Sequence, residues 1–322
     1  MQKLYPLRLR GVTRSPIWGG TRLLREWNKP ADTPTVGESW ELTLRRDETA
    51  TVTDGTLKGR TLTELVTEYG DAITGGGFGK DDFPLLIKLL DADDRLSVQV
   101  HPNDAYAARV ENDRGKTEMW YVVDADEGAE IICGLADGVD ESGFAQAVAC
   151  GRLSDALQHV PVHAGEVYFI PAGLPHAIGK GILIAEIQQN CDLTYRVYDY
   201  DRVDTNGCKR ELHVEKALEV IRPFTDEEID AIRYAKAPKG FDRSRLLAHC
   251  AYFRVEKLTL TDRALTLPAK KMLHLLCIDG AATLHCNGED YPIEKGDSYL
   301  IPACLCDVAL TGSSTLLMTS VD

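Results

Sequence analysis

The chain has 322 residues, a formal net charge of −14, 44% hydrophobic residues and 27% charged residues. Its length exceeds that of one ordinary hydrophobic core and suffices for two domains, and its composition is typical of a soluble globular protein. The negative charge disfavours nucleic acid and anionic membrane surfaces as partners, and no apolar run is long enough to cross a bilayer.

The beginning of the chain and its cysteines both predict a cytoplasmic protein. Residues 1–8 lack the apolar core of a signal peptide. The nine cysteines are scattered and include no Cys-x-x-Cys pair, which is the pattern of reduced thiols.

Short apolar segments dominate the chain and predict a mainly β protein. They are rich in Val, Ile, Leu and Tyr, and Gly, Pro and Asp separate them. Helices interrupt this pattern. A capping box of Thr61 and Glu64 begins one helix, and others are expected over about 140–158, over 214–221 and from Thr225. Strands are expected over 38–44, 84–90, 95–101, 118–123, 166–171, 181–188 and 193–200.

Two distant segments of the chain resemble each other. Residues 165–176 and 296–307 align without gaps, with Gly, an acid, Tyr, Ile-Pro-Ala and Leu in register. The shared turn, strand and turn is the form that closes a small β-barrel, so we interpret the match as a duplicated jelly-roll unit. In the second copy Asp307 stands in place of His176, which predicts that this copy binds no metal.

The stretch 234–243 has the composition of a linker. We therefore expect two jelly-roll barrels. The first domain, 1–240, contains the inserted helices, and the second, 241–322, is a metal-free β domain.

Three short polar segments next to strand-forming runs supply a set of potential metal ligands. Gln99 and His101 lie at the end of one expected strand, Glu118 begins the next, and His176 follows a turn that contains two prolines. Two imidazoles, one carboxylate and one amide oxygen suit Zn²⁺ or a similar divalent ion held with an open position. For Gln99 the alternative is a hydrogen bond to another ligand.

Polar side chains that share one face of otherwise apolar strands indicate a polar lumen inside a barrel. Because the faces of a strand alternate, residues two apart point the same way. A solvent-exposed face would not explain why the opposite face is also apolar, so we interpret the polar face as a site. Shared faces are expected for Ser97, Gln99 and His101, for Lys116, Glu118 and Trp120, for Glu186, Gln188 and Asn190, and for Arg196, Tyr198 and Tyr200.

Four basic residues, Lys88, Lys116, Arg196 and Arg202, add positive charge to the same region. In a protein this acidic, such a cluster suggests an anionic ligand such as a phosphate. The alternative is that each basic group pairs with a nearby acid, and it applies to Arg202 and Lys88 more than to Arg196.

Several of these runs, in this order, resemble class I mannose-6-phosphate isomerase in its short bacterial form. The resemblance covers essentially the whole chain, is densest between residues 83 and 202, and includes the early runs 18–20 and 37–42. The matching runs are Phe83–Lys88, Leu96–Pro102, Gly115–Tyr121, Ile170–His176 and Leu193–Arg196.

The resemblance implies a zinc enzyme with a cupin fold that interconverts mannose 6-phosphate and fructose 6-phosphate. It implies one Zn²⁺ per chain, and it makes 1–240 the catalytic cupin domain and 241–322 a cupin-like one. The implied zinc ligands are Gln99, His101, Glu118 and His176. The implied catalytic residues are Arg196, Glu186 and Lys116, and the implied substrate-binding residues are Ser97, Lys88 and Arg202.

The groups present suggest isomerisation through an enediol, which needs a base over the sugar carbons and a partner for the developing oxyanion. Glu186 is our candidate for the base and Lys116 is its competitor. The expected partner is a small phosphosugar, with no nucleic acid and no membrane, and the protein is expected to be a monomer or homodimer.

Two other functions fit part of the pattern. A cupin oxidoreductase with Fe(II) and O₂ also uses two histidines and one carboxylate, but Gln99 and the basic cluster argue against it. A non-catalytic sugar-phosphate-binding protein is the second alternative, and the intact ligand set argues against that function.

Overall fold

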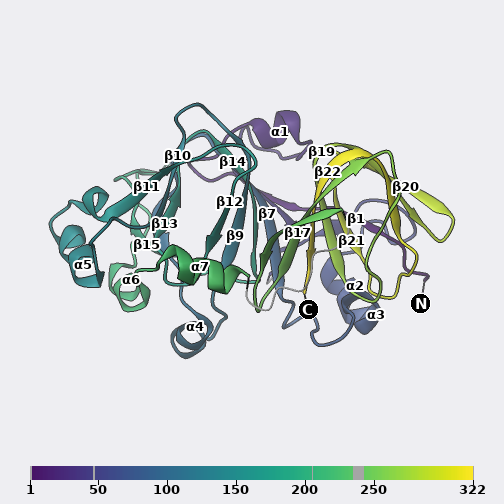
Figure 1. Cartoon of the computed structure of the whole chain (residues 1–322), viewed down its shortest axis with the longest axis horizontal. Coiled ribbons are helices and arrows are strands. Elements are labelled where there is room, and N and C mark those ends of the chain that lie inside the picture. Colours follow the sequence, from purple (N-terminus) through teal and green to yellow (C-terminus); the bar gives the residue numbers. More distant parts are fainter. Residues whose placement is uncertain (1, 46–47, 205, 235–242, 322) are drawn as a thin grey trace.

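The computed structural model describes residues 2–45, 48–204, 206–234 and 243–321. Most of the predicted linker 234–243 therefore lies outside the described residues. Three large β-sheets run side by side across the molecule, and the helices lie at its periphery (Figure 1). The predicted mainly β fold class is confirmed.

A six-stranded antiparallel sheet occupies the middle of the molecule, with strand order β12-β9-β14-β7-β3-β2. Its central strands β7 and β14 are buried along their whole length, because other layers cover both faces of this sheet. The strands are β2 (Val12–Arg14), β3 (Glu38–Leu42), β7 (Leu85–Ala92), β9 (Glu118–Ala125), β12 (Val167–Ile170) and β14 (Ile182–Gln189).

A five-stranded sheet packs against one face of the six-stranded sheet, with strand order β11-β10-β13-β8-β15. Trp18, Trp120 and Ile184 contribute to the apolar cluster between the two sheets, together with Ile131 and Ile178. Two such sheets packed face to face are the architecture of a jelly roll. The strands are β8 (Val98–Val100), β10 (Glu130–Leu135), β11 (Leu157–Pro161), β13 (His176–Ile178) and β15 (Tyr195–Tyr198).

A nine-stranded sheet contains the C-terminal strands and also two strands from the beginning of the chain. Leu7 of β1 pairs with Leu300 of β21, and Leu9 of β1 pairs with Val52 of β6. The division at about residue 240 stays a prediction, but strands from both sides of it share this sheet. The strands are β1 (Leu7–Arg10), β6 (Thr51–Val52), β16 (Ser244–His249), β17 (Arg254–Thr261), β18 (Leu265–Thr266), β19 (Leu273–Cys286), β20 (Glu289–Glu294), β21 (Ser298–Ile301) and β22 (Ala309–Ser320).

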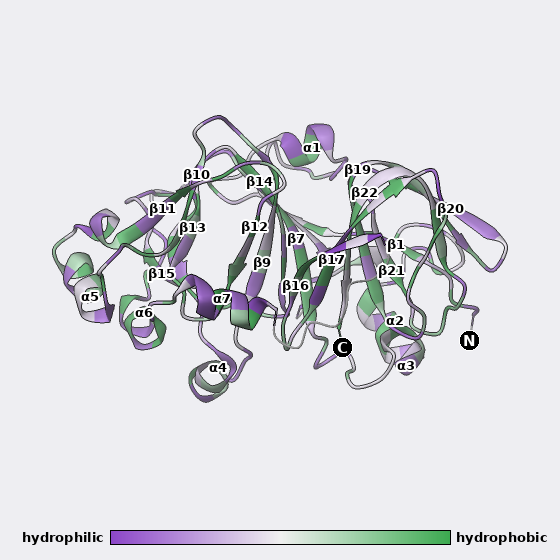
Figure 2. Cartoon of the chain, viewed as in Figure 1, coloured by the Kyte–Doolittle hydropathy of each residue, from purple (hydrophilic) through white to green (hydrophobic). Residues whose placement is uncertain are grey.

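One continuous apolar core joins the six-stranded and nine-stranded sheets. Ile87 and Met119 contribute to it from the first sheet, and Val255, Leu276 and Leu300 contribute from the second. Figure 2 shows that hydrophobic residues gather on the strands in the interior, while hydrophilic residues lie on α7 and on the outlying hairpin at β20. The C-terminal strands therefore support the sheet that carries the site described below.

The two segments that resemble each other adopt the same local structure. Gly165 and Gly296 precede β12 and β21 with φ angles of 90° and 89°, a region that favours glycine. Each glycine donates its N–H to a strand carbonyl, that of Val122 or that of Cys277. A Cβ on Gly296 would also lie 2.6 Å from the carbonyl oxygen of Trp27.

The predicted capping box of Thr61 with Glu64 is confirmed, and the helix expected from Thr225 is confirmed and begins with a capping box of Thr225 and Glu228. The helical structure expected over about 140–158 is found in part, as α5 and a 3₁₀ turn, because the chain takes a φ of 68° at Gly151 and the α-helix ends before it. None of the helices in the described ranges is long and apolar enough to span a membrane. The helices are α1 (Arg22–Glu26), α2 (Leu62–Tyr69), α3 (Asp71–Thr74), α4 (Asp104–Val110), α5 (Glu141–Ala149), η1 (Leu153–Ala156), α6 (Val214–Val220) and α7 (Asp226–Arg233), and β4 (Leu44–Arg45) pairs with β5 (Glu48–Thr49) in a small separate sheet.

A buried polar network joins β3 to the nine-stranded sheet. Lys29 Nζ donates to Glu41 Oε2 at 2.7 Å and to the Gly296 carbonyl at 2.6 Å. His274 Nε2 lies 2.8 Å from Ser298 Oγ. Burial, and then the charge of Lys29, lower the pKa of His274 to about 3, so this imidazole is neutral in the folded protein at neutral pH.

We expect His274 to make the protein less stable as the pH falls below 6.5. The unfolded chain then takes up a proton that the folded chain excludes until its own, lower pKa is reached. Between pH 7 and pH 5 this difference lowers the free energy of unfolding by about 2 kcal/mol. Urea denaturation at both pH values should show that loss in the natural protein, and a smaller loss in His274→Gln. Equal losses in both proteins would contradict the assignment.

Candidate active site

The inner face of the six-stranded sheet carries the polar side chains that the sequence places together. In the strand register, Glu118 of β9 lies opposite Gln188 of β14, Trp120 lies opposite Glu186, and Glu186 lies opposite Lys88 of β7. Partners opposite each other in an antiparallel pair share a face. The predicted face of Glu118 with Trp120, and of Glu186 with Gln188, is therefore confirmed.

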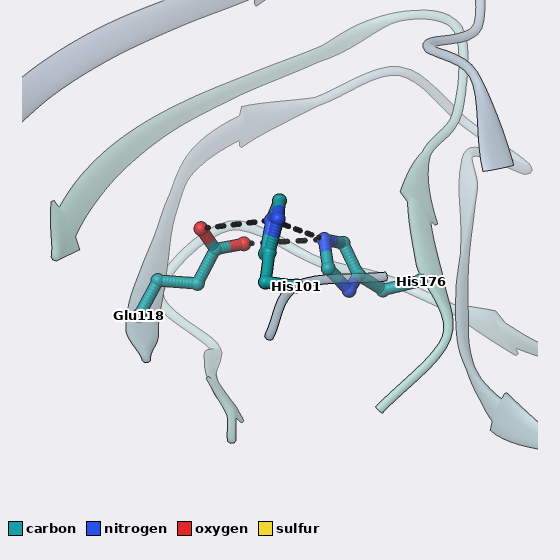
Figure 3. Close-up of side chains that lie close together, drawn as sticks. All are labelled: His101, Glu118 and His176. Atoms are coloured by element: carbon teal, nitrogen blue, oxygen red, sulfur yellow. Dashed lines mark hydrogen bonds and ion pairs between the residues drawn. The ribbon is translucent and has the colours of Figure 1, made fainter. Parts of the chain in front are cut away.

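The five-stranded sheet supplies the histidines from the opposite side. His176 begins β13 and pairs in register with Gln99 of β8, and His101 directly follows β8. Figure 3 shows the Glu118 carboxylate pointing toward both imidazole rings. Residues from two sheets thus converge between the two layers.

Glu118, His101 and His176 form a compact buried group, with one potential ligand atom of each within 4.8 Å of the others. The two Nε2 atoms lie 3.1 Å apart. Glu118 Oε2 lies 3.6 Å from Nε2 of His101, and Oε1 lies 3.4 Å from Nε2 of His176. Two nitrogens bonded to one tetrahedral zinc at about 2 Å lie about 3.3 Å apart, so the spacing fits a shared metal ion.

The protonation of these groups also suits a metal. His176 Nδ1 lies 2.8 Å from the Leu174 carbonyl, so that nitrogen carries the proton and Nε2 is free to coordinate. Burial, and then the charge of Lys116, lower the pKa of His101 and that of His176, the latter to about 4. Glu118 Oε1 is buried without a hydrogen-bond partner among the described residues.

Gln99 lies beside this group. Its Nε2 atom is 3.3 Å from His176 Nε2, and a 180° flip of the amide would present the oxygen there instead. The structure thus brings all four predicted ligands to one place, while their roles as ligands stay a prediction.

Two lysines pair with the two carboxylates of the site. Lys116 Nζ lies 2.6 Å from Glu118 Oε2, and Lys88 Nζ lies 3.0 Å from Glu186 Oε2. Burial opposes the charge of Lys116, but Glu118 and Glu186 raise its pKa. Burial would raise the pKa of Glu186, but Lys116 and Lys88 lower it to about 2. At neutral pH the site therefore holds a charged ammonium beside an ionised carboxylate.

Arg196 pairs in register with Gln99 and so faces the same lumen. Its Nη1 donates to the Glu211 carbonyl at 2.7 Å, and burial, then the charge of Arg210, lower its pKa.

Tyr198 does not share this face. A bulge follows Arg196, and Tyr198 pairs with Val98. The prediction that Arg196 and Tyr198 point the same way is wrong, because the bulge inserts one residue.

Arg202 is held by acids. Its Nη2 lies 2.6 Å from Asp199 Oδ1, and its Nη1 lies 3.1 Å from Asp94 Oδ2. The pairing alternative raised for Arg202 is thus observed. Ser97, immediately before β8, is buried.

Two tryptophans that were not predicted as ligands, catalytic residues or substrate-binding residues also line the site. The Trp120 ring meets the His176 ring edge-on at 5.4 Å, and its Nε1 donates to Glu186 Oε1 at 3.3 Å. Lys88 Nζ lies 4.9 Å from the centre of the Trp40 ring. Trp40 pairs in register with Lys88, and its only signal in the sequence is its place in the run 37–42.

Comparison with known proteins agrees with this geometry. Residues 7–146 match the family model of the phosphomannose isomerase type I catalytic domain, and residues 243–321 match that of the mannose-6-phosphate isomerase cupin domain. A mannose-6-phosphate isomerase of Bacillus subtilis is 38% identical over 315 residues, which cover 98% of each chain. The chain belongs to the type I mannose-6-phosphate isomerase family. A mannose-6-phosphate isomerase of Streptococcus mutans is 37% identical over 297 residues, 92% of each chain.

Solved structures extend the comparison. The crystal structure of a mannose 6-phosphate isomerase from Bacillus subtilis superposes with a TM-score of 0.87 at 33% identity, covering 98% of this chain and 99% of that one. A phosphomannose isomerase variant from Salmonella typhimurium gives a TM-score of 0.79 at 15% identity, covering 98% and 99%, and shows a shared fold. The chain is thus an enzyme of this family, and the buried group at its lumen is its candidate active site.

Proposed function

We propose that the protein interconverts mannose 6-phosphate and fructose 6-phosphate with one bound Zn²⁺ per chain. The observation that carries the proposal is the buried convergence of His101, Glu118 and His176 in a member of this family. Gln99 is the proposed fourth ligand. When bound, zinc supplies positive charge that polarises sugar oxygens without redox chemistry.

Glu186 is the proposed base. Its carboxylate is ionised at neutral pH, because Lys116 and Lys88 lower its pKa despite burial. It can take the proton from C2 of the open-chain aldose. The electron pair of that bond then forms the C1–C2 double bond, and the carbonyl oxygen O1 takes up a proton to give the enediol. Loss of the O2 proton to form the C2 carbonyl, with return of a proton to C1, completes the ketose. Lys116 is protonated at neutral pH, because Glu118 and Glu186 raise its pKa despite burial, so it is in the form that donates a proton.

Charged groups around the lumen are the proposed contacts for substrate oxygens. Lys116 and Arg196 can stabilise negative charge on the enediolate or on the phosphate. Ser97, Lys88 and Arg202 stay predicted substrate-binding residues. Lys88 and Arg202 already pair with Glu186 and Asp199, so an incoming anion competes with those carboxylates for them.

A coupled assay of the purified, zinc-loaded protein tests the proposal. Addition of mannose 6-phosphate should yield fructose 6-phosphate, and an inactive protein would contradict it. Oxygen uptake with an iron-loaded sample would support the oxidoreductase alternative. Tight sugar phosphate binding without turnover would support the binding protein. A cytoplasmic location and a monomeric or homodimeric state stay predictions.

Gln99→Leu separates the two roles considered for this side chain. If Gln99 is a ligand, we expect the zinc dissociation constant to rise by at least about tenfold, since loss of even an outer contact of a metal site costs that much. X-ray absorption of the bound zinc should then show one fewer light-atom ligand. An unchanged ligand count would assign Gln99 to orienting His176.

A further inference from the structure

A side-chain amide continues the sheet at the point where its last strand pair ends. The register of β14 with β9 ends at Gln188 opposite Glu118. Beyond it, the Gln189 N–H donates to the Thr117 carbonyl at 3.2 Å, and the Thr117 N–H donates to Gln189 Oε1 at 2.9 Å. Gln189 and Thr117 are both buried. Thr117, between Lys116 and Glu118, is therefore held on its carbonyl by the Gln189 backbone and on its N–H by the Gln189 side chain.

Asp104, at the start of α4, joins this glutamine to the same segment. Its Oδ1 accepts from Gln189 Nε2 at 3.0 Å and from the Gly115 N–H at 2.9 Å. The Lys116 N–H instead donates to the Pro102 carbonyl at 3.0 Å. Three successive amides are thus fixed, and two of them depend on Asp104 or Gln189.

The C-terminal part of the chain reaches this group through Tyr252. The residue lies in the turn between β16 and β17, next to buried Phe253, and its hydroxyl donates to Asp104 Oδ2 at 2.6 Å. Burial, and then the hydrogen bond to Asp104, raise the pKa of Tyr252, so the hydroxyl stays a donor at neutral pH.

We propose that Tyr252, Asp104 and Gln189 form a positioning relay that fixes Lys116 and Glu118 for metal binding and catalysis. None of the three relay residues is a predicted site residue. Through the contact of Tyr252 with Asp104, which lie 148 positions apart, the relay connects the C-terminal strands to the active site. The effect of the relay on catalysis rests on the proposed function, but its effect on the backbone at Lys116 and Glu118 does not.

Hydrogen exchange of the metal-free protein tests the relay without substrate or metal. Tyr252→Phe and Gln189→Met should speed exchange of the Gly115 and Thr117 amides. The Lys116 amide is an internal control, because its partner is the Pro102 carbonyl. Tyr291→Phe is the matched control, since the Tyr291 hydroxyl donates to the exposed Glu289 at 2.7 Å. Unchanged exchange in Tyr252→Phe would overturn the relay.

Zinc affinity and kinetics test the consequence for the site. We expect Gln189→Met to weaken zinc binding by about tenfold or more, and Tyr252→Phe to weaken it less in the same direction. At saturating zinc, kcat should fall while KM for mannose 6-phosphate stays within about twofold. Tyr291→Phe should change neither. If Gln189→Met does not fold, the zinc affinity and kcat of Tyr252→Phe test the relay instead.

The outcomes separate the two proposals. Absence of turnover in the natural protein would contradict the proposed function, while exchange and zinc affinity would still test the relay. Normal turnover, exchange and zinc affinity in Tyr252→Phe would overturn the relay and leave the proposed function intact.

Discussion

We expect His176→Ala to lower isomerase activity by at least about a hundredfold, because a bound metal supplies several kcal/mol of stabilisation to the developing charge. Nε2 of the ring lies 3.1 Å from His101 Nε2 and 3.4 Å from Glu118 Oε1, so its loss removes one of the proposed zinc ligands. Zinc content after dialysis should fall with activity. The measurement is turnover of mannose 6-phosphate beside metal analysis of the same sample.

His163→Ala is the matched control for this substitution. His163 is exposed, its Nδ1 lies 3.4 Å from Glu166 Oε1, and it does not belong to the group of potential ligands. We expect it to keep full zinc content and activity. Full zinc content in His176→Ala would contradict the proposed ligand set.

We expect Glu186→Gln to lower kcat by about a hundredfold to ten-thousandfold, which is the contribution of a positioned base, and to leave zinc bound. The amide cannot accept the proton from C2, yet it keeps the shape of the carboxylate and its contact with Trp120 Nε1. Steady-state kinetics with metal analysis will separate loss of chemistry from loss of metal. Glu130→Gln is the matched control, because Glu130 pairs with His159 at an exposed position.

Lys116→Met is the competing test of the base. Lys116 contacts Glu118 at 2.6 Å and His101 at 3.1 Å, so its loss should change zinc affinity as well as kcat. If Glu186→Gln kept its kcat while Lys116→Met lost it with zinc still bound, the base would be Lys116. Turnover in D₂O should incorporate deuterium into the product if the reaction passes through an enediol.

The sequence predicted the contents of the site better than its surroundings. His101 and Glu118 could be predicted because short strands alternate their faces, so residue types and spacing indicate which side chains enter a lumen. His176 could be predicted from the turn with two prolines that precedes it. Tyr198 was assigned to the wrong face because no residue in its strand signals the bulge after Arg196. One inserted residue is enough to reverse a face.

Long-range pairings were the features that the sequence did not predict. The pairing of β1 with β21 joins residues about 290 positions apart, and local patterns do not encode such partners. Tyr252 and Asp104 likewise come from a hairpin turn and a helix start. Each of those segments is an ordinary turn or cap by its local sequence, and only the folded chain brings them together.

Anomalous diffraction at the zinc edge, from crystals of the zinc-loaded protein, tests the central claim most directly. We predict one peak per chain, at about 2 Å from Nε2 of His101, Nε2 of His176 and a carboxylate oxygen of Glu118. A peak elsewhere in the chain, or no peak between these three side chains, would contradict the account.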